Sequence, residues 1–276
     1  MHQNDPKFGA DAYPFEQRKS WYSSVAEAYN QVRPRYPQAL CDRIIELTQL
    51  PPSAAILELG CGPGNATVTF AQKGYKIVCI EPSMAACQLA KQNCATYPQV
   101  EINNTTFEEW ELEAERFNAV LAATSIHWMT PEIVYPKAAA ALQNNGYLIL
   151  LWNMTAQLPY EDEACQSLKK AYQKYAPSLG KYEDRATQTQ ILKEFGQVVT
   201  DSGHFGGLVS EQMQWEVTYS IDDYLLLLST YSPYMALEPQ QRDDLFASLQ
   251  EILEQNGENS VQLSHLSAFH IAQKTL

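Results

Sequence analysis

The sequence predicts an α/β fold with a doubly wound, mostly parallel sheet, and two observations support this prediction. A short apolar run at residues 54–59 has the composition of a buried strand, breaks into glycines at 60, 62 and 64, and continues as a helical pattern at 65–72. Strand-like and helix-like segments then alternate as far as residue 152, which is typical of parallel strands joined by crossover helices. The chain of 276 residues is long enough to bury a substantial core.

The following elements continue this alternation. Gly74 marks the end of the first helix, Ser83 is placed to cap the next, and Thr130 with Pro131 marks the start of the third. The expected strands are 75–80, 99–103, 117–123 and 146–152, and the expected helices are 84–93 and 131–142.

The alternation ends near residue 155. Residues 160–200 are expected to form two or three helices, interrupted at Pro177 and Gly180. Strand character returns at 208–219 and again at 261–272, with helices at about 221–231 and 238–255 between them. The expected organisation is a helical N-terminal preface at 1–50, an α/β domain formed by 51–154 and 204–276, and a helical lid insertion at 155–203.

Composition limits the partners of this chain. The formal net charge is −13 and no long Lys/Arg cluster offsets it, which disfavours nucleic-acid phosphates and anionic membrane surfaces. No run of about 18 apolar residues predicts a membrane span, and the N-terminus lacks the layout of a secretory signal. We therefore expect a cytoplasmic protein that acts on a small molecule, with no nucleic-acid or membrane partner.

The cysteines predict neither disulfides nor a metal site. Six cysteines are scattered along the chain without any Cys-x-x-Cys pair, so we expect reduced thiols and no bound metal. They stand at positions 41, 61, 79, 87, 94 and 165.

The glycines at 60, 62 and 64 favour a ligand over a purely structural turn. Glycine adopts positive φ without strain and has no Cβ, so a ligand can lie against the backbone while the next helix points its free N–H groups at it. The dinucleotide fingerprint Gly-x-Gly-x-x-Gly requires its third glycine one position later, where this chain has Asn65. Glu58, two residues before the first glycine, suits a ligand that carries an ammonium group better than one that carries phosphates.

The segment Glu-Leu-Gly-Cys-Gly-Pro-Gly-Asn, residues 58–65, resembles the first motif of the class I S-adenosylmethionine-dependent methyltransferases. The resemblance implies a Rossmann-like, seven-stranded sheet whose last strand is antiparallel. It also implies S-adenosylmethionine as the cofactor and S-adenosylhomocysteine as the product. The motifs that carry the resemblance span residues 56–152, about a third of the chain.

Further cofactor contacts are expected after the second and third strands. Glu81 lies where doubly wound nucleotide folds place an acid for the ribose hydroxyls, although a solvated carboxylate at a strand end is the simpler alternative. The resemblance implies that Met84 lines the adenosine slot. The family usually has Asp at the position of Thr106, so Thr106 and Phe107 are expected to share the adenine contact, unless this segment is an ordinary loop.

In the family, the end of the fourth strand faces the methyl group of the cofactor, which places Thr124 beside the reaction space. His127 is then a candidate base, or simply a hydrogen-bonded wall of the pocket. Trp128 would present its ring to the sulfonium cation, or pack without contacting it.

The layout is most similar to the trans-aconitate methyltransferase group and related small-molecule enzymes. A carboxylic acid acceptor would pair with Arg33 or Arg35, because a guanidinium binds a carboxylate bidentately, whereas a surface role for both arginines is the alternative. Tyr22, Tyr29 and Tyr36 would close over the cofactor or serve amphipathic packing.

We therefore expect a methyltransferase that moves a methyl group to a small-molecule acceptor by direct in-line transfer. The alternatives are a non-catalytic S-adenosylmethionine-binding module and, less favoured by the glycine spacing, an NAD-type dehydrogenase. The sequence predicts neither the acceptor nor the oligomeric state.

Overall fold

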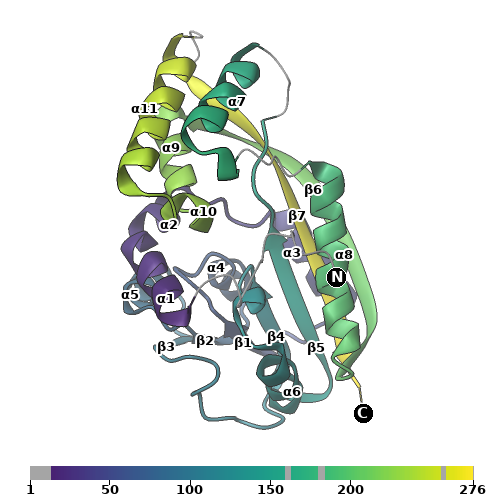
Figure 1. Cartoon of the computed structure of the whole chain (residues 1–276). Helices are drawn as coiled ribbons and strands as arrows, with labels where there is room; N and C mark the ends of the chain where they lie inside the picture. The colour runs from purple at the N-terminus through teal and green to yellow at the C-terminus, as the bar shows by residue number, and fades with distance from the viewer. Residues whose placement is uncertain (1–13, 159–162, 180–183, 256–258, 276) are drawn as a thin grey trace.

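The computed structural model describes residues 14–158, 163–179, 184–255 and 259–275. Within these residues the chain forms a seven-stranded sheet of order β3-β2-β1-β4-β5-β7-β6 (Figure 1). Strands β1 to β5 pair in parallel, and β7 runs antiparallel to both β5 and β6. The predicted doubly wound sheet with an antiparallel last strand is therefore confirmed. The strands are β1 Ala55–Leu59, β2 Lys76–Ile80, β3 Val100–Asn103, β4 Phe117–Ala123, β5 Leu142–Asn153, β6 Phe205–Ser220 and β7 Ser260–Lys274.

The described helices follow the expected order with shifted ends. Ser83 caps α5 by accepting a hydrogen bond from Ala86 N at 3.3 Å, and Pro131 begins α6 as predicted, although the Thr130 hydroxyl makes no capping bond. The helices are α1 Phe15–Ser24, α2 Ala26–Val32, α3 Gln38–Thr48, α4 Thr67–Gln72, α5 Met84–Asn93, α6 Pro131–Ala141, α7 Glu163–Tyr175, α8 Arg185–Asp201, α9 Ile221–Ser229, α10 Ser232–Met235 and α11 Pro239–Gln255, with 3₁₀ turns at Ile126–Trp128 and Pro177–Leu179.

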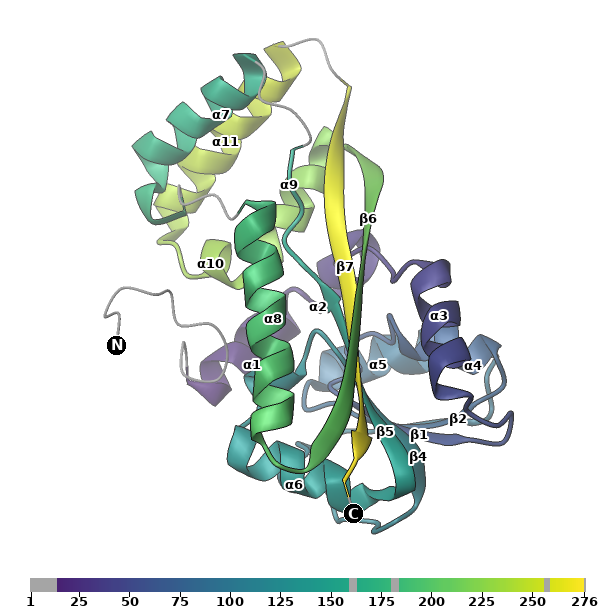
Figure 2. The ribbon, with the colours of Figure 1, turned by 90° about the vertical axis from the view of Figure 1, so that its right-hand side faces the viewer.

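The central strands are apolar throughout because helices cover both faces of the sheet. Leu57 and Val120 belong to the core on one face, whereas Ile56 and Leu121 belong to the core on the other. Figure 2 shows α3 and α4 on one side of the sheet and α6 and α8 on the other. This double burial explains why these strands could be located from their apolar runs.

Strands β6 and β7 are longer than predicted and form a two-stranded ribbon that extends beyond the rest of the sheet (Figure 2). Helices α7, α9, α10 and α11 gather around the far half of this ribbon. We call this group the helical lobe. Its own core includes Leu168 of α7, Leu227 of α9, Leu249 of α11 and Leu263 of β7. Figure 1 shows the lobe above the carboxyl ends of the parallel strands.

The segment expected as a lid divides between two places. Helix α7 packs against α11 in the helical lobe, whereas α8 packs against β6 and β7 on the sheet.

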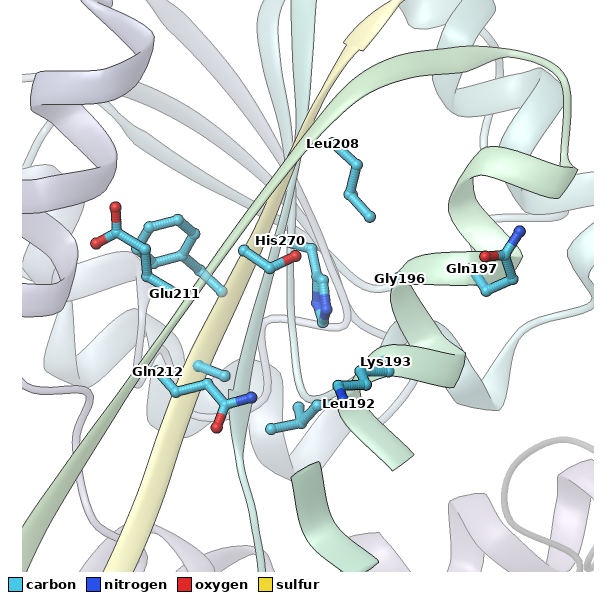
Figure 3. A pocket seen from close by; sticks show the side chains of 11 residues that line it. Leu192, Lys193, Gly196, Gln197, Leu208, Glu211, Gln212 and His270 are labelled. Atoms are coloured by element: carbon cyan, nitrogen blue, oxygen red, sulfur yellow. The ribbon is translucent and has the colours of Figure 1, made fainter. Parts of the chain in front are cut away.

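Helix α8 approaches the ribbon closely at Gly196. A Cβ at this position would lie 3.0 Å from His270 and from Leu208, so glycine permits the close approach. Figure 3 looks into a cavity of about 280 Å³ between α8 and the ribbon. The proposed boundaries of the domains stay a prediction.

The five described cysteine side chains are free, buried thiols. Burial raises the pKa of Cys41 and of Cys94 to about 12, so neither is a thiolate near neutral pH. The side chain of Cys165 lies outside the described part of the structure.

Among the described helices, no segment has both the length and the apolar composition of a membrane span. The described residues also contain no group of three potential metal ligands.

Candidate active site at the carboxyl edge of the sheet

The glycine turn joins β1 to α4 and requires glycine at three positions. Gly60, Gly62 and Gly64 have φ values of +64°, +56° and +90°, which side chains with a Cβ rarely adopt. Gly60 N donates to Ile80 O at 2.7 Å, which ties the turn to the end of β2. The turn therefore presents bare backbone at the carboxyl edge of the sheet.

Glu81 connects this turn to α5. Its Oε2 accepts a hydrogen bond from Gly62 N at 2.9 Å, and its Oε1 accepts one from Ser83 N at 2.8 Å. The side chain is buried, and this burial raises the pKa of Glu81 to about 7 although both bonds oppose the shift. Each oxygen keeps a second lone pair with which to accept a bond from a ligand hydroxyl.

Tyr22 of α1 covers the glycine turn. A Cβ placed on Gly62 would lie 2.4 Å from the Tyr22 hydroxyl, so a side chain at this position would displace the tyrosine. The Tyr22 ring meets Tyr29 edge-on at 5.2 Å, and the neighbouring Ser23 shares a hydrogen bond of 2.8 Å with Ser83 at the start of α5. The preface helices thus reach the same edge as the turn.

Glu58 lies inside the protein, beneath the turn. Its Oε2 accepts a hydrogen bond from Thr67 Oγ1 at 2.7 Å, while no described residue bonds to its Oε1. Complete burial raises the pKa of Glu58 to about 8, so the carboxyl is largely protonated at neutral pH. The expected contact with a ligand ammonium group stays a prediction, and this geometry gives Glu58 a second role in supporting the turn from below.

Thr124 has a strained backbone at the end of β4. Its φ is +54°, an unusual value for a β-branched residue, and such strain is concentrated at functional sites. The Thr124 hydroxyl lies 2.7 Å from Tyr36 OH and accepts a bond from Asn153 N at 3.2 Å. Two separate segments therefore hold this residue at the edge.

His127 lies in an aromatic cluster on the α8 side of the sheet. Its ring centroid is 4.7 Å from that of Trp128 and 5.7 Å from that of Trp152. Trp152 stacks on Phe195 of α8 at 4.2 Å and donates from Nε1 to His270 Nδ1 at 2.8 Å. The surroundings of His127 are thus mainly aromatic, and its role as base or pocket wall stays open.

The residues predicted to hold adenosine lie around the ends of β2 and β3. Met84, at the start of α5, is 55% exposed. The Thr106 hydroxyl accepts a bond from Glu109 N at 3.1 Å, whereas the Phe107 ring is buried and stacks on Trp110. A ligand at this place would meet the backbone of Phe107 rather than its ring.

The two arginines are held by neighbouring segments. Arg33 donates from Nε to Thr230 Oγ1 at 2.8 Å and from Nη2 to Thr230 O at 2.9 Å, and it stacks over Tyr231. Arg35 is exposed and donates to the Oδ1 atom of Asn65, directly after the glycine turn. Arg33 therefore ties the preface to the helical lobe, and Arg35 ties it to the turn.

Asn153 and Phe195 are not among the site residues expected from the sequence. Asn153 follows the predicted strand 146–152 and so falls at the carboxyl edge, where ligands bind in open α/β sheets, which is a usable signal. Phe195 reaches Trp152 only because α8 packs on the ribbon, and no local pattern predicts that packing.

The residues at this edge fit S-adenosylmethionine. The glycines present backbone without side chains, and Tyr22 covers Gly62 so closely that a Cβ there would displace it. The buried Glu81 lies between the turn and α5 with acceptor capacity left for hydroxyl groups. Exposed Met84, three residues after Glu81 at the start of α5, offers an apolar side chain.

This fold, this glycine turn and the segment matched below are those of a class I S-adenosylmethionine-dependent methyltransferase domain. A family model described as a methyltransferase domain matches residues 56–146, which include the turn, Glu81 and the end of β4. The cofactor of this class is S-adenosylmethionine.

Curated relatives carry the same description. An uncharacterised methyltransferase of Schizosaccharomyces pombe is 24% identical over 237 residues, which cover 85% of this chain and 87% of the relative. An uncharacterised methyltransferase of Mycobacterium bovis is 31% identical over 134 residues, or 48% of this chain and 51% of the relative. The chain thus spans about half the length of the mycobacterial relatives that it matches.

Solved structures share the fold at low sequence identity. A candidate type II methyltransferase from Anaeromyxobacter dehalogenans superposes with a TM-score of 0.62 at 18% identity, covering 87% of this chain and 97% of that one. The Haemonchus contortus phosphoethanolamine N-methyltransferase 2, solved with phosphomonomethylethanolamine and S-adenosylhomocysteine, gives a TM-score of 0.52 at 15% identity, covering 95% of this chain and 59% of that one. These likenesses concern the fold alone.

Proposed function

We propose that this protein transfers a methyl group from S-adenosylmethionine to a small-molecule acceptor. The observation that carries the proposal is the hydrogen bond from Gly62 N to Glu81 Oε2, 2.9 Å long, because it joins the cofactor turn to a buried acid at the carboxyl edge. The match to a methyltransferase domain over residues 56–146 covers this same pair.

The bound cofactor supplies an activated methyl group on its sulfonium. The protein's contribution is to align the acceptor with that group and to exclude water, which can supply much of the rate without a covalent intermediate. The glycine turn and Glu81 hold the donor, Thr124 borders the methyl position, and the preface with Tyr22 covers the turn.

The chemistry of the acceptor decides whether the protein must supply a base such as His127. A carboxylate acceptor is already a nucleophile and needs no base, whereas a phenol, an amine or a carbon acid must lose a proton. For these acceptors His127 is the proposed base, and the packed rings of Trp128 and Trp152 would fix its orientation.

A carboxylic acid is the finer proposal for the acceptor. Two arginines, Arg33 and Arg35, lie in the segment that also carries Tyr36 to the Thr124 hydroxyl. A guanidinium on this segment would recognise a carboxylate close to the edge of the sheet.

The experiment is a turnover screen. Purified protein is incubated with S-adenosylmethionine and panels of small carboxylic acids, phenols and amines, and the release of S-adenosylhomocysteine is measured. We expect release above background with at least one panel and loss of that release in Glu81→Gln. Tight cofactor binding without release in any panel would favour the non-catalytic binding module instead.

A further inference from the structure

One side chain of α6, Lys137, holds the loop that follows β3. Its Nζ atom donates to three backbone carbonyl oxygens, those of Phe107 at 2.7 Å, Glu108 at 3.0 Å and Trp110 at 2.5 Å. An ammonium group has three N–H donors, so these bonds use its full capacity to donate. Lys137 is therefore committed to the backbone of this loop.

The ammonium group also lies against the aromatic side chains of the loop. Lys137 Nζ is 5.2 Å from the centroid of the Phe107 ring and 5.8 Å from that of Trp110, and these two rings stack on each other at 6.0 Å. Desolvation lowers the pKa of Lys137 below its ordinary value. The ammonium has thus exchanged part of its water for the carbonyl oxygens and rings of the loop.

The other end of the loop is tied to Glu81, which the proposed function assigns to the methyl donor. Asn104 Nδ2 donates to Glu81 O at 2.9 Å, and Glu81 N donates to Asn103 O at 3.0 Å. Between the two ends, Trp110 N donates to Thr106 O at 3.0 Å and closes a turn. The loop is therefore held on one side by the end of β2 and on the other by α6.

The proposed adenine contacts stand between these two ties. Thr106 and Phe107 follow Asn104 in the chain, and Phe107 itself gives a carbonyl to Lys137. Hydrogen bonds to the edge of a base require donor and acceptor about 3 Å apart and well aligned. A small shift of this backbone would therefore change which base is bound before it changed the packing of the core.

We infer that Lys137 is a positioning residue that sets the selectivity of the cofactor site for adenine. The convergence of three carbonyl groups on its ammonium holds the backbone of Thr106 and Phe107 where the edge of the base is bound. Lys137 acts through the loop and not by contact with the base. This inference rests on the proposed function, because the adenine belongs to the methyl donor.

The test compares S-adenosylhomocysteine with S-inosylhomocysteine, in which a carbonyl oxygen replaces the 6-amino group of the base. Calorimetric titration of the full chain with each compound gives the ratio of their dissociation constants. We expect the wild type to bind the adenine compound about tenfold or more tightly. In Lys137→Met, which keeps an unbranched stem beside the rings, the ratio should fall to about threefold or less, because the adenine compound loses more affinity.

Lys137→Arg is a second variant that keeps the positive charge and the long stem, and so favours a folded protein. A planar guanidinium cannot aim three donors from a single nitrogen as an ammonium does, so the ratio should again fall, by about threefold or more. Lys193→Met, at an exposed lysine of α8, is the matched control and should keep the wild-type ratio. Circular dichroism and the unfolding midpoint establish that each variant is folded.

An unchanged ratio in either folded Lys137 variant would overturn the inference and leave the proposed function intact. This includes a loss of affinity by the same factor for both compounds, which is the result that a purely structural lysine would give. Equal binding of the two compounds by the wild type would overturn it as well. Failure of the wild type to bind S-adenosylhomocysteine at about 1 mM would instead contradict the proposed function, and this inference with it.

Discussion

The Tyr36 hydroxyl lies 2.7 Å from Thr124 Oγ1, which joins the segment before α3 to the strained residue at the end of β4. The two residues are far apart from each other in sequence. Thr124 also accepts a bond from Asn153 N. The N-terminal preface is therefore part of the proposed active site rather than an independent appendage.

Tyr36→Phe should lower the free energy of unfolding by about 1 kcal/mol, because a buried hydroxyl bond is lost without a large cavity. It should also weaken S-adenosylmethionine binding several-fold, since Thr124 loses one of its supports. Urea denaturation and calorimetry measure the two effects. The predicted loss of stability together with an unchanged cofactor affinity would mean that this bond serves the fold alone.

Glu81→Gln should reduce S-adenosylmethionine affinity about tenfold or more. The glutamine side chain has one carbonyl oxygen, so it cannot accept bonds from both Gly62 N and Ser83 N as the carboxyl group does. Glu132→Gln on the exposed start of α6 is the control and should leave the affinity unchanged. Similar affinities in all three proteins would remove Glu81 from the cofactor site.

The stability of the protein should depend on pH through Glu58. Its pKa is about 8 when folded against a reference of 4.5, so the folded state binds this proton more tightly than the unfolded chain does. The associated stability is complete below about pH 4.5 and is lost as the pH rises through 8. Glu81, with a pKa raised to about 7, acts in the same direction.

Glu58→Gln carries no titrating proton at this position, so its free energy of unfolding should fall less between about pH 5 and pH 8.5 than that of the wild type. Over this range the free energy of unfolding of the wild type should fall by about 1 kcal/mol or more beyond that of Glu58→Gln. Urea denaturation at both pH values gives the comparison, and parallel pH dependence in the two proteins would contradict the buried, protonated state of Glu58.

Gly196→Ala should destabilise the protein by up to about 2 kcal/mol, because the new Cβ would lie 3.0 Å from His270 and from Leu208. This net value is an overpacking cost of about 1–3 kcal/mol less the gain in helix propensity of about 1 kcal/mol that alanine brings. Gly206→Ala is a matched control, since the nearest atom there would be an ordinary 3.5 Å away. Thermal unfolding distinguishes them, and equal midpoints for the two variants would show that α8 adjusts freely.

The parallel half of the fold could be predicted because its signals are local. Apolar runs mark β1, β2 and β4, which are buried by helices on both faces, and Ser83 and Pro131 mark helix starts by their own chemistry. The extent of β6 could not be predicted in this way. Most of its residues alternate between partly buried and exposed, and its length depends on pairing with β7, a contact between distant segments.

The same contrast applies to the candidate site. That the three glycines and Glu81 lie together could be predicted from spacing, because the turn and the end of β2 meet at one edge of the sheet. The position of Tyr22 over Gly62 and the stacking of Phe195 on Trp152 depend on how α1 and α8 pack. No spacing within the sequence encodes those contacts.

The most direct test of the central claim is calorimetric titration of the wild type and of Gly62→Val with S-adenosylmethionine, with NAD in parallel. We predict S-adenosylmethionine binding on the order of micromolar to the wild type and no comparable binding of NAD. Gly62→Val, confirmed as folded by circular dichroism, should lose the affinity at least tenfold, because the new side chain would displace Tyr22 from the turn and cover the backbone there. Binding of NAD without S-adenosylmethionine, or unchanged affinity in folded Gly62→Val, would contradict the claim that this turn holds the methyl donor.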